Sequence, residues 1–121
     1  MRKVVPGFLC GAVALAFVLI TAPAWGHAVL VESYPAAKSE VAGPDLEIRL
    51  KFNVRIDAPR SRLQLVLADG STRPLILTSG GSPNLVTSSA TGLRPGNYKL
   101  LWQVLASDGH ITRGAIPFVV K

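Results

Sequence analysis

The sequence predicts an all-β protein, an antiparallel β-sandwich of about seven strands in a Greek-key arrangement. Three observations predict this class. Apolar and polar residues alternate with a period of two along much of residues 27–121, and no segment there has a helical period. Eight glycines and seven prolines interrupt this part of the chain at short intervals. Tyr98 follows a tight turn at the start of a strand, as in the tyrosine corner of Greek-key sandwiches.

The individual strands follow from this alternation in chain order. In residues 46–52 every second residue is apolar and those between are charged, which predicts a strand with one buried and one solvated face. Two apolar runs flank Asp69-Gly70 and predict a hairpin, and Pro74 places its second arm at a sheet edge or delays its start. The expected strands are residues 28–31, 46–52, 63–67, 75–77, 85–87, 98–105 and 116–120. The strand at 98–105 becomes apolar on both faces, which predicts a central position.

Residues 1–26 have the pattern of a cleaved signal peptide. A basic start is followed by an apolar run of about 17 residues, and the small residues Ala24 and Gly26 fit a signal-peptidase site. We therefore expect cleavage after Gly26, export, and a soluble mature domain of residues 27–121. The alternatives are an uncleaved anchor and a lipoprotein. Cys10 argues against a lipoprotein, because it lies at the front of the apolar run rather than after it.

The composition of residues 27–121 limits their chemistry. This segment has no cysteine and no methionine, which excludes disulfides and sulfur ligands, so the fold must depend on one apolar core. Its net charge is +4 once Arg2 and Lys3 are removed. We interpret this charge as the solvated face of a small sandwich, with an anionic partner (nucleic acid, phospholipid or acidic protein) as the alternative. Nucleic acid is disfavoured, because no aromatic residues interleave the basic ones, which are Arg49, Lys51, Arg55, Arg60, Arg62, Arg73, Arg94, Lys99 and Arg113.

The chain has only two histidines, and both occupy unusual positions. His27 becomes the first residue after the predicted cleavage, so its α-amine and imidazole can chelate one metal ion. Asp108 and His110 are two residues apart, and in an extended backbone both side chains point the same way. One amine, two imidazoles and one carboxylate suit Cu(II), and less specifically Ni(II) or Zn(II). The alternative is that Asp108 and His110 are solvated residues of an ordinary turn.

Two segments give the chain a resemblance to a known family. Residues 27–36 read His-Ala-Val-Leu-Val-Glu-Ser-Tyr-Pro-Ala, and residues 102–110 read Trp-Gln-Val-Leu-Ala-Ser-Asp-Gly-His. Together with Leu50-Lys51-Phe52 and the turn before Tyr98, they resemble the CopC family of small periplasmic copper-binding proteins. The resemblance covers nearly all of residues 27–121. It implies an Ig-like β-sandwich and a high-affinity Cu(II) site.

Carried over residue by residue, the resemblance implies that His27, Asp108 and His110 are the metal ligands. It also implies a periplasmic location and an inner-membrane, CopD-like copper transporter as partner. Two departures restrict the site. Val54 stands where some members of the family carry a glutamate, and residues 27–121 lack the methionine-rich loop that provides a Cu(I) site in others. We therefore expect a Cu(II)-only binding protein.

The expected function is that of a periplasmic copper carrier or buffer in copper resistance or homeostasis, rather than an enzyme. The second hypothesis is a copper-dependent oxidative enzyme of the histidine-brace type, which also uses an amino-terminal histidine. The third is a metal-free Ig-like adhesion module. Trp102 lies on the strand that leads to the candidate site, and we expect it in the core.

Overall fold

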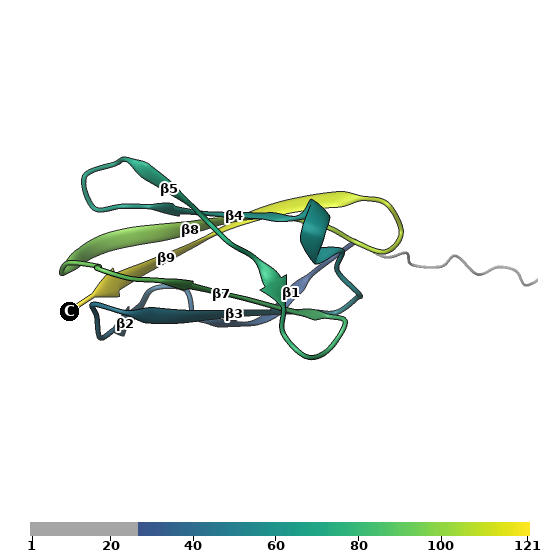
Figure 1. Ribbon diagram of the computed structural model, residues 1–121, viewed down its shortest axis with the longest axis horizontal. Helices are drawn as coiled ribbons and strands as arrows, with labels where there is room; N and C mark the ends of the chain where they lie inside the picture. The colour runs from purple at the N-terminus through teal and green to yellow at the C-terminus, as the bar shows by residue number, and fades with distance from the viewer. Residues whose placement is uncertain (1–26) are drawn as a thin grey trace, which may run out of the picture.

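The computed structural model describes residues 27–121, so the predicted signal peptide lies outside the described residues. These residues form a sandwich of two sheets (Figure 1). The four-stranded sheet has the order β1-β3-β7-β6. Its strands are β1 (Leu30–Tyr34), β3 (Leu46–Phe52), β6 (Thr78–Ser79) and β7 (Leu85–Ala90). In this part of the chain, no helix is long and apolar enough to cross a membrane.

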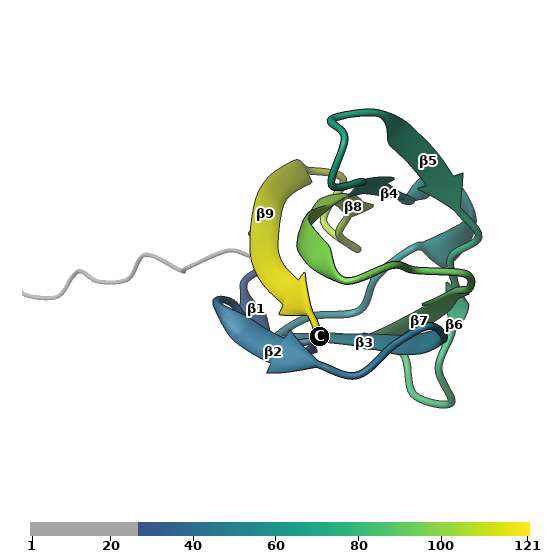
Figure 2. The same ribbon diagram turned by 90° about the vertical axis from the view of Figure 1, so that its left-hand side faces the viewer.

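The five-stranded sheet has the order β2-β9-β8-β4-β5 and forms the second layer (Figure 2). Its strands are β2 (Ser39–Val41), β4 (Arg62–Val66), β5 (Thr72–Leu75), β8 (Gly96–Leu105) and β9 (Ile111–Val120). A short 3-10 helix, η2 (Ala58–Arg60), precedes β4, and the Asp57 side chain caps it by accepting from the Arg60 N–H. The prediction of an all-β sandwich is confirmed.

Several strand predictions are confirmed in position, although some of these strands are longer than predicted. Residues 46–52 form β3 as predicted, and β8 is central as predicted, because it pairs with β4 on one side and β9 on the other. Pro74 does lie in an edge strand, β5. The structure lengthens three strands: β7 continues to Ala90, β8 begins at Gly96 instead of residue 98, and β9 begins at Ile111 instead of residue 116. The polar residues in these extensions pair along a neighbouring strand, which alternation of apolar residues does not reveal.

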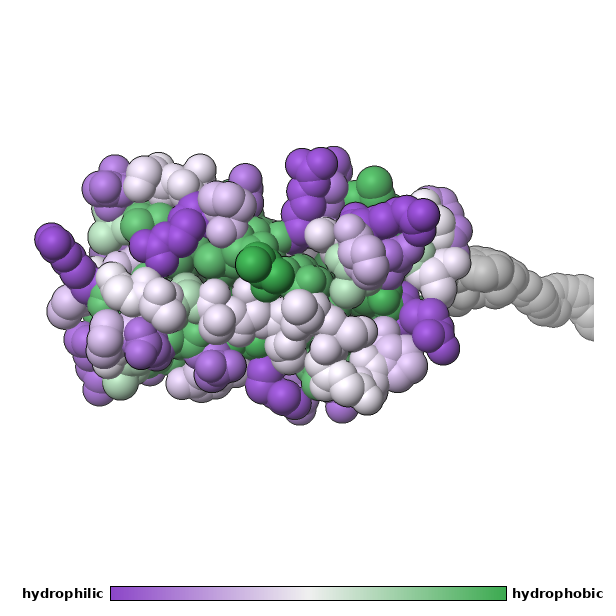
Figure 3. All heavy atoms as spheres, viewed as in Figure 1, coloured by the Kyte–Doolittle hydropathy of each residue, from purple (hydrophilic) through white to green (hydrophobic). Residues whose placement is uncertain are grey.

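Other strand predictions were wrong. The first strand begins at Leu30 rather than Ala28. The second hairpin arm ends at Leu75, and residues 76–77 instead carry the chain from one sheet to the other. Ile76 is 82% exposed there, and Figure 3 shows an apolar strip on this side of the molecule. The count of about seven was too low: the described residues form nine strands, because β2 and β6 are too short to show a period.

One pairing departs from a purely antiparallel sandwich. Strand β2 runs parallel to β9, with Ser39 opposite Phe118 and Val41 opposite Val120. The Lys121 N–H also donates to the Val41 carbonyl at 2.9 Å, so the carboxyl end of the chain is fastened to this edge. A parallel pairing of three residues leaves no signal in the sequence, because it depends on two segments almost 80 residues apart.

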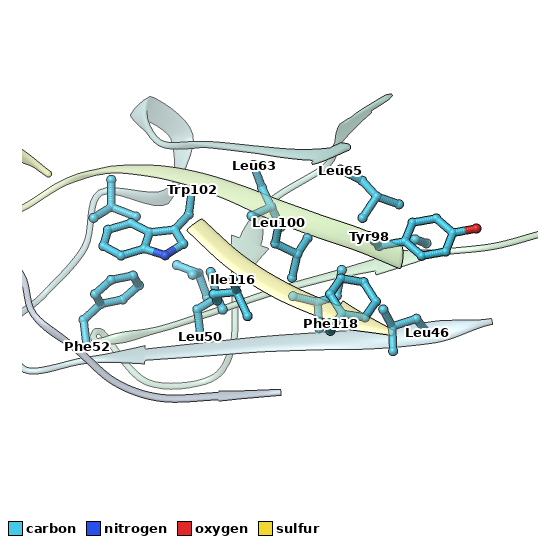
Figure 4. Close-up of a cluster of buried hydrophobic side chains, with 14 of the residues drawn as sticks. Leu46, Leu50, Phe52, Leu63, Leu65, Tyr98, Leu100, Trp102, Ile116 and Phe118 are labelled. Atoms are coloured by element: carbon cyan, nitrogen blue, oxygen red, sulfur yellow. The ribbon is translucent and has the colours of Figure 1, made fainter. Parts of the chain in front are cut away.

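The core lies between the sheets and is built by inward-facing residues of both (Figure 4). Strand β3 alternates strictly between buried and exposed residues, and Leu50 and Phe52 are completely buried. Each such side chain contributes about 1.5–3 kcal/mol by leaving water. Across the core from β3, strand β8 contributes Tyr98, Leu100, Trp102 and Val104.

The tyrosine corner is present as predicted. The Tyr98 hydroxyl donates to the Arg94 carbonyl at 2.8 Å and accepts from the Arg94 N–H at 3.0 Å. Its ring stacks on Phe118 of β9 with 5.7 Å between ring centroids. The corner therefore fixes the turn into β8 to the core.

Trp102 lies in the core, as expected from the sequence. Its indole leaves no room for a side chain on the residue opposite it in the neighbouring strand. Its ring meets Phe52 edge-to-face, with centroids 5.2 Å apart. Gly114 is its register partner in β9, and the indole covers the Gly114 Cα so closely that a Cβ built there would lie 2.8 Å from the Trp102 Nε1. A side chain at Gly114 would displace the indole.

We predict that Gly114→Ala lowers the free energy of unfolding by about 1–3 kcal/mol, the usual cost of overpacking a core. Chemical denaturation followed by circular dichroism would measure the loss. The neighbouring Ala115 is exposed, so Ala115→Ser is the control and should change stability by less than about 0.5 kcal/mol. Equal stability of Gly114→Ala and the unsubstituted protein would show that Trp102 does not depend on this glycine.

Candidate metal centre

The loop between β8 and β9, residues 106–110, has a defined conformation. The Ala106 N–H donates to the His110 carbonyl at 2.9 Å, and the Gly109 N–H donates to the Ala106 carbonyl at 2.9 Å. Gly109 has φ +89°, a left-handed conformation that glycine adopts without steric cost. The Ser107 N–H donates to the Arg55 carbonyl at 3.1 Å, which fastens the loop to the segment after β3.

Asp108 and His110 contact each other within this turn. The Asp108 Oδ1 accepts from the His110 backbone N–H at 3.0 Å, and the Asp108 Oδ2 lies 3.1 Å from the His110 Nδ1. These two hydrogen bonds hold the pKa of the Asp108 carboxyl below its ordinary value, and the bond from the His110 backbone N–H has the larger effect. The group is therefore an anion at neutral pH. The His110 side chain stays 61% exposed, whereas that of Asp108 is 20% exposed.

His27 reaches this loop from the other sheet because the residues after it are fixed. Ala28 is buried in the core at 3% exposure. The Val29 N–H donates to the Asn53 Oδ1 at 2.7 Å, and the Asn53 N–H donates back to the Val29 carbonyl at 3.0 Å. A buried alanine and a two-point clamp on the following residue thus hold the chain at the end of the sandwich where His27 lies.

The three predicted site residues come together at that end, where the start of the β1 segment and the β8–β9 loop lie beside each other (Figure 1). One ligand atom from each of His27, Asp108 and His110 lies within 4.8 Å of the others. The two imidazole rings are 4.9 Å apart at an angle of 67°. Each of the three residues as a whole is exposed, although the Asp108 side chain is largely covered. Two imidazoles and a carboxylate at this spacing are a set of nitrogen and oxygen ligands that an ion can approach from solvent.

One part of the geometric prediction was wrong. The sequence argument placed Asp108 and His110 in extended backbone, with both side chains pointing the same way. The structure instead places them in a tight turn through Gly109, where the Asp108 side chain folds back onto the His110 backbone. Asp108 and His110 are therefore brought together locally, by the positive φ of Gly109 and one side-chain hydrogen bond.

Sequence analysis missed Asn53. Asn53 lies at the end of an alternating strand, and nothing in that position indicates a contact with Val29. The sequence therefore carried no signal for its role. The neighbouring Val54 packs against the core and offers no ligand. Among residues 27–121, only His27, Asp108 and His110 form a cluster of three potential ligand residues.

These features define a class of protein. It is a small Greek-key sandwich with an exposed cluster of two histidines and one carboxylate at one end. Comparison with known families assigns it further: a CopC domain matches residues 30–121. The chain belongs to the CopC family, and the resemblance found in the sequence is confirmed.

Individual relatives agree with this assignment. Copper resistance protein C of Pseudomonas syringae pv. tomato is 32% identical over 110 residues, which cover 85% of this chain and 87% of the relative. Protein YobA of Escherichia coli strain K12 is 31% identical over 106 residues, covering 85% and 86%. The crystal structure of CopC from Methylosinus trichosporium OB3b is 29% identical, with a TM-score of 0.74 over 78% of this chain and 94% of that one.

A methionine-rich relative has the same fold. The crystal structure of PcoC, a methionine-rich copper resistance protein from Escherichia coli, is 27% identical, with a TM-score of 0.65 over 79% of this chain and all of that one. Residues 27–121 of this chain contain no methionine. The two chains therefore share a sandwich but differ in the sulfur ligands that they can offer.

Proposed function

We propose that this protein is a periplasmic Cu(II) carrier or buffer that holds one ion at His27, Asp108 and His110. The observation that carries the proposal is the position of His27. Its imidazole lies 4.9 Å from that of His110, although 82 residues separate them in sequence. Imidazole nitrogens and a carboxylate oxygen are ligands that Cu(II) accepts.

The proposal requires export and cleavage after Gly26, so that residues 27–121 are the mature domain. In the uncleaved chain the His27 nitrogen belongs to a peptide bond. Cleavage turns it into an amine, which adds a fourth ligand from a residue already at the site. A single proteolytic step thus completes a set of three nitrogens and one oxygen.

The ligand types support Cu(II) as the oxidation state of the bound ion. Cu(I) prefers thiolate and thioether ligands, and residues 27–121 contain neither cysteine nor methionine. Nitrogen and oxygen ligands favour Cu(II). Residues 27–121 therefore offer no sulfur ligand for a separate Cu(I) site.

Exposure of the ligands favours transport over catalysis. His110 keeps most of its surface accessible, so an incoming ligand from an acceptor can approach the metal as the carrier releases it. Asp108 would occupy a position that an oxygen-activating enzyme leaves open. We propose a CopD-like inner-membrane transporter as the partner in transfer.

The first test is titration with Cu(II). The exported protein, with its amino terminus at His27 established by intact mass, should bind one Cu(II) tightly in calorimetry. A variant with one alanine inserted before His27 should bind roughly 100-fold more weakly or worse, because an amide replaces the amine. The inserted residue leaves every side chain in place, which makes the extended protein a matched control.

Three results separate the hypotheses. Absence of Cu(II) binding by protein that starts at His27 would contradict the carrier and favour a metal-free module. Equal affinity of both forms would show that the amine is not a ligand. Peroxide formation by the copper-loaded protein with ascorbate would favour an oxidative enzyme.

Substitution of the loop ligands should give unequal losses. His110→Ala removes an imidazole and should weaken Cu(II) binding by roughly 100-fold, whereas Asp108→Ala should cost less, because water can replace a carboxylate oxygen. Quenching of Trp102, the only tryptophan in residues 27–121, gives a convenient measure. The reverse order of losses would mean that the carboxylate is the principal loop ligand.

Asn53→Ala should weaken Cu(II) binding by roughly 10-fold without removing a ligand, because it releases Val29 and therefore His27. Asn84→Ala is the matched control. Asn84 makes the same kind of two-point clamp on Phe52, at 2.8 Å in each direction, but makes no hydrogen bond to Val29. Cu(II) affinity and the electron paramagnetic resonance spectrum should change only in Asn53→Ala. If both variants changed them equally, Asn53 would act through general stability alone.

A further inference from the structure

The outer faces of the two sheets differ in character. On the four-stranded sheet the outward residues of β3 are charged, with Glu32 of β1 opposite Lys51 and Tyr34 opposite Arg49, and the exposed Val31 and Tyr34 are confined to the edge strand β1. On the five-stranded sheet about half of the outward residues of the three central strands are apolar, and the others are cations or the neutral Gln64, Asn97 and Gln103. The apolar ones are Val66 of β4, Leu101 and Leu105 of β8, and Ile111, Ala115, Pro117 and Val119 of β9; Ile111 and Ala115 are exposed and the rest half-buried.

This apolar face carries cations but no acid on its central strands. Arg62, Lys99 and Arg113 point outward from β4, β8 and β9. Within residues 27–121 none of the three lies within ion-pair distance of a carboxylate. The Arg113 Nε instead donates to the neutral Gln103 Oε1 at 2.9 Å. Among the five strands of this sheet the one acidic residue is Glu40, on the edge strand β2, and its Oε1 lies 4.0 Å from the Lys121 Nζ.

The same face is hollowed beside Lys99. A depression of about 450 Å³ has Val66, Pro117 and Val119 among its lining residues, together with Lys38 and Lys99. Apolar walls with two ammonium groups are complementary to an anionic amphiphile, whose phosphate meets the lysines while its hydrocarbon meets the walls.

From this pattern we infer that the outer face of the β4–β8–β9 sheet docks on an anionic phospholipid bilayer. Apolar side chains would enter the headgroup boundary, and the interspersed cations would meet the phosphates. A second copy of the chain is a poor occupant, because it would bring the same unpaired cations toward each other. A protein partner is less favoured, because the centre of a protein interface is depleted in charge, whereas these cations lie among the apolar side chains.

Docking in this way would also place the candidate metal centre close to the bilayer. Leu105 and Ile111 are paired on this face, and they directly flank the loop that carries Asp108 and His110. This consequence rests on the proposed function. The docking itself needs no metal, so a test without copper separates the two.

The test is sedimentation of the exported, metal-free protein with vesicles. Binding should occur with an equimolar mixture of phosphatidylglycerol and phosphatidylcholine, fail with phosphatidylcholine alone, and weaken as salt is raised above about 0.1 M. The double variant Lys99→Glu, Arg113→Glu should bind at least roughly tenfold more weakly. The double variant Arg49→Glu, Lys51→Glu alters net charge identically on the opposite face, and its affinity should fall by less than about twofold.

Leu101→Gln measures the apolar contribution and should also weaken vesicle binding, while circular dichroism shows that each variant is folded. No binding of the unsubstituted protein to anionic vesicles would overturn the proposal and leave an acidic protein as the candidate partner. Equal losses in the two double variants would also overturn it, because attraction would then depend on net charge and not on this face.

Discussion

The pairing of β8 with β9 is the interaction on which most of this molecule depends. Ten residue pairs, from Gly96 opposite Val120 to Leu105 opposite Ile111, form the longest ladder in the structure. The inward side of this hairpin supplies Trp102 and Tyr98 to the core, and its outward side forms the apolar, cationic face. Its closed end is the loop that carries Asp108 and His110. A register slip of one residue would exchange the two sides and move the loop ligands.

The second requirement is that the start of the domain reaches the end of this hairpin. His27 and Ala28 precede β1, which pairs with β3 in the opposite sheet. No strand pairing holds His27, so its place depends on the burial of Ala28 and on the contact between Val29 and Asn53. The two halves of the candidate site therefore come from different sheets, and the packing of the sandwich sets the distance between them. A core substitution such as Gly114→Ala would change the packing of the two sheets and, with it, the distance between the two halves of the candidate site.

Exposure of the site and shielding of the core are compatible because the site lies at the end of the sandwich rather than between the sheets. The ligand side chains meet solvent, whereas Trp102 and Phe52 fill the space inside the same end. The domain thus needs neither disulfides nor a bound metal to account for its core. A metal at this position would fasten the two sheets together, so binding and stability would be linked.

The sequence by itself determined the fold class, the central position of β8, the tyrosine corner and the three candidate ligands, because each depends on a local pattern of alternation, turn or residue type. It also excluded sulfur chemistry from residues 27–121 by composition alone. Only the tertiary structure decided that His27 lies beside His110, that Asn53 holds Val29, that β2 pairs with β9, and that Arg62, Lys99 and Arg113 share one face. These relations join residues far apart in the chain, and only strand register and sheet packing set the distances between them.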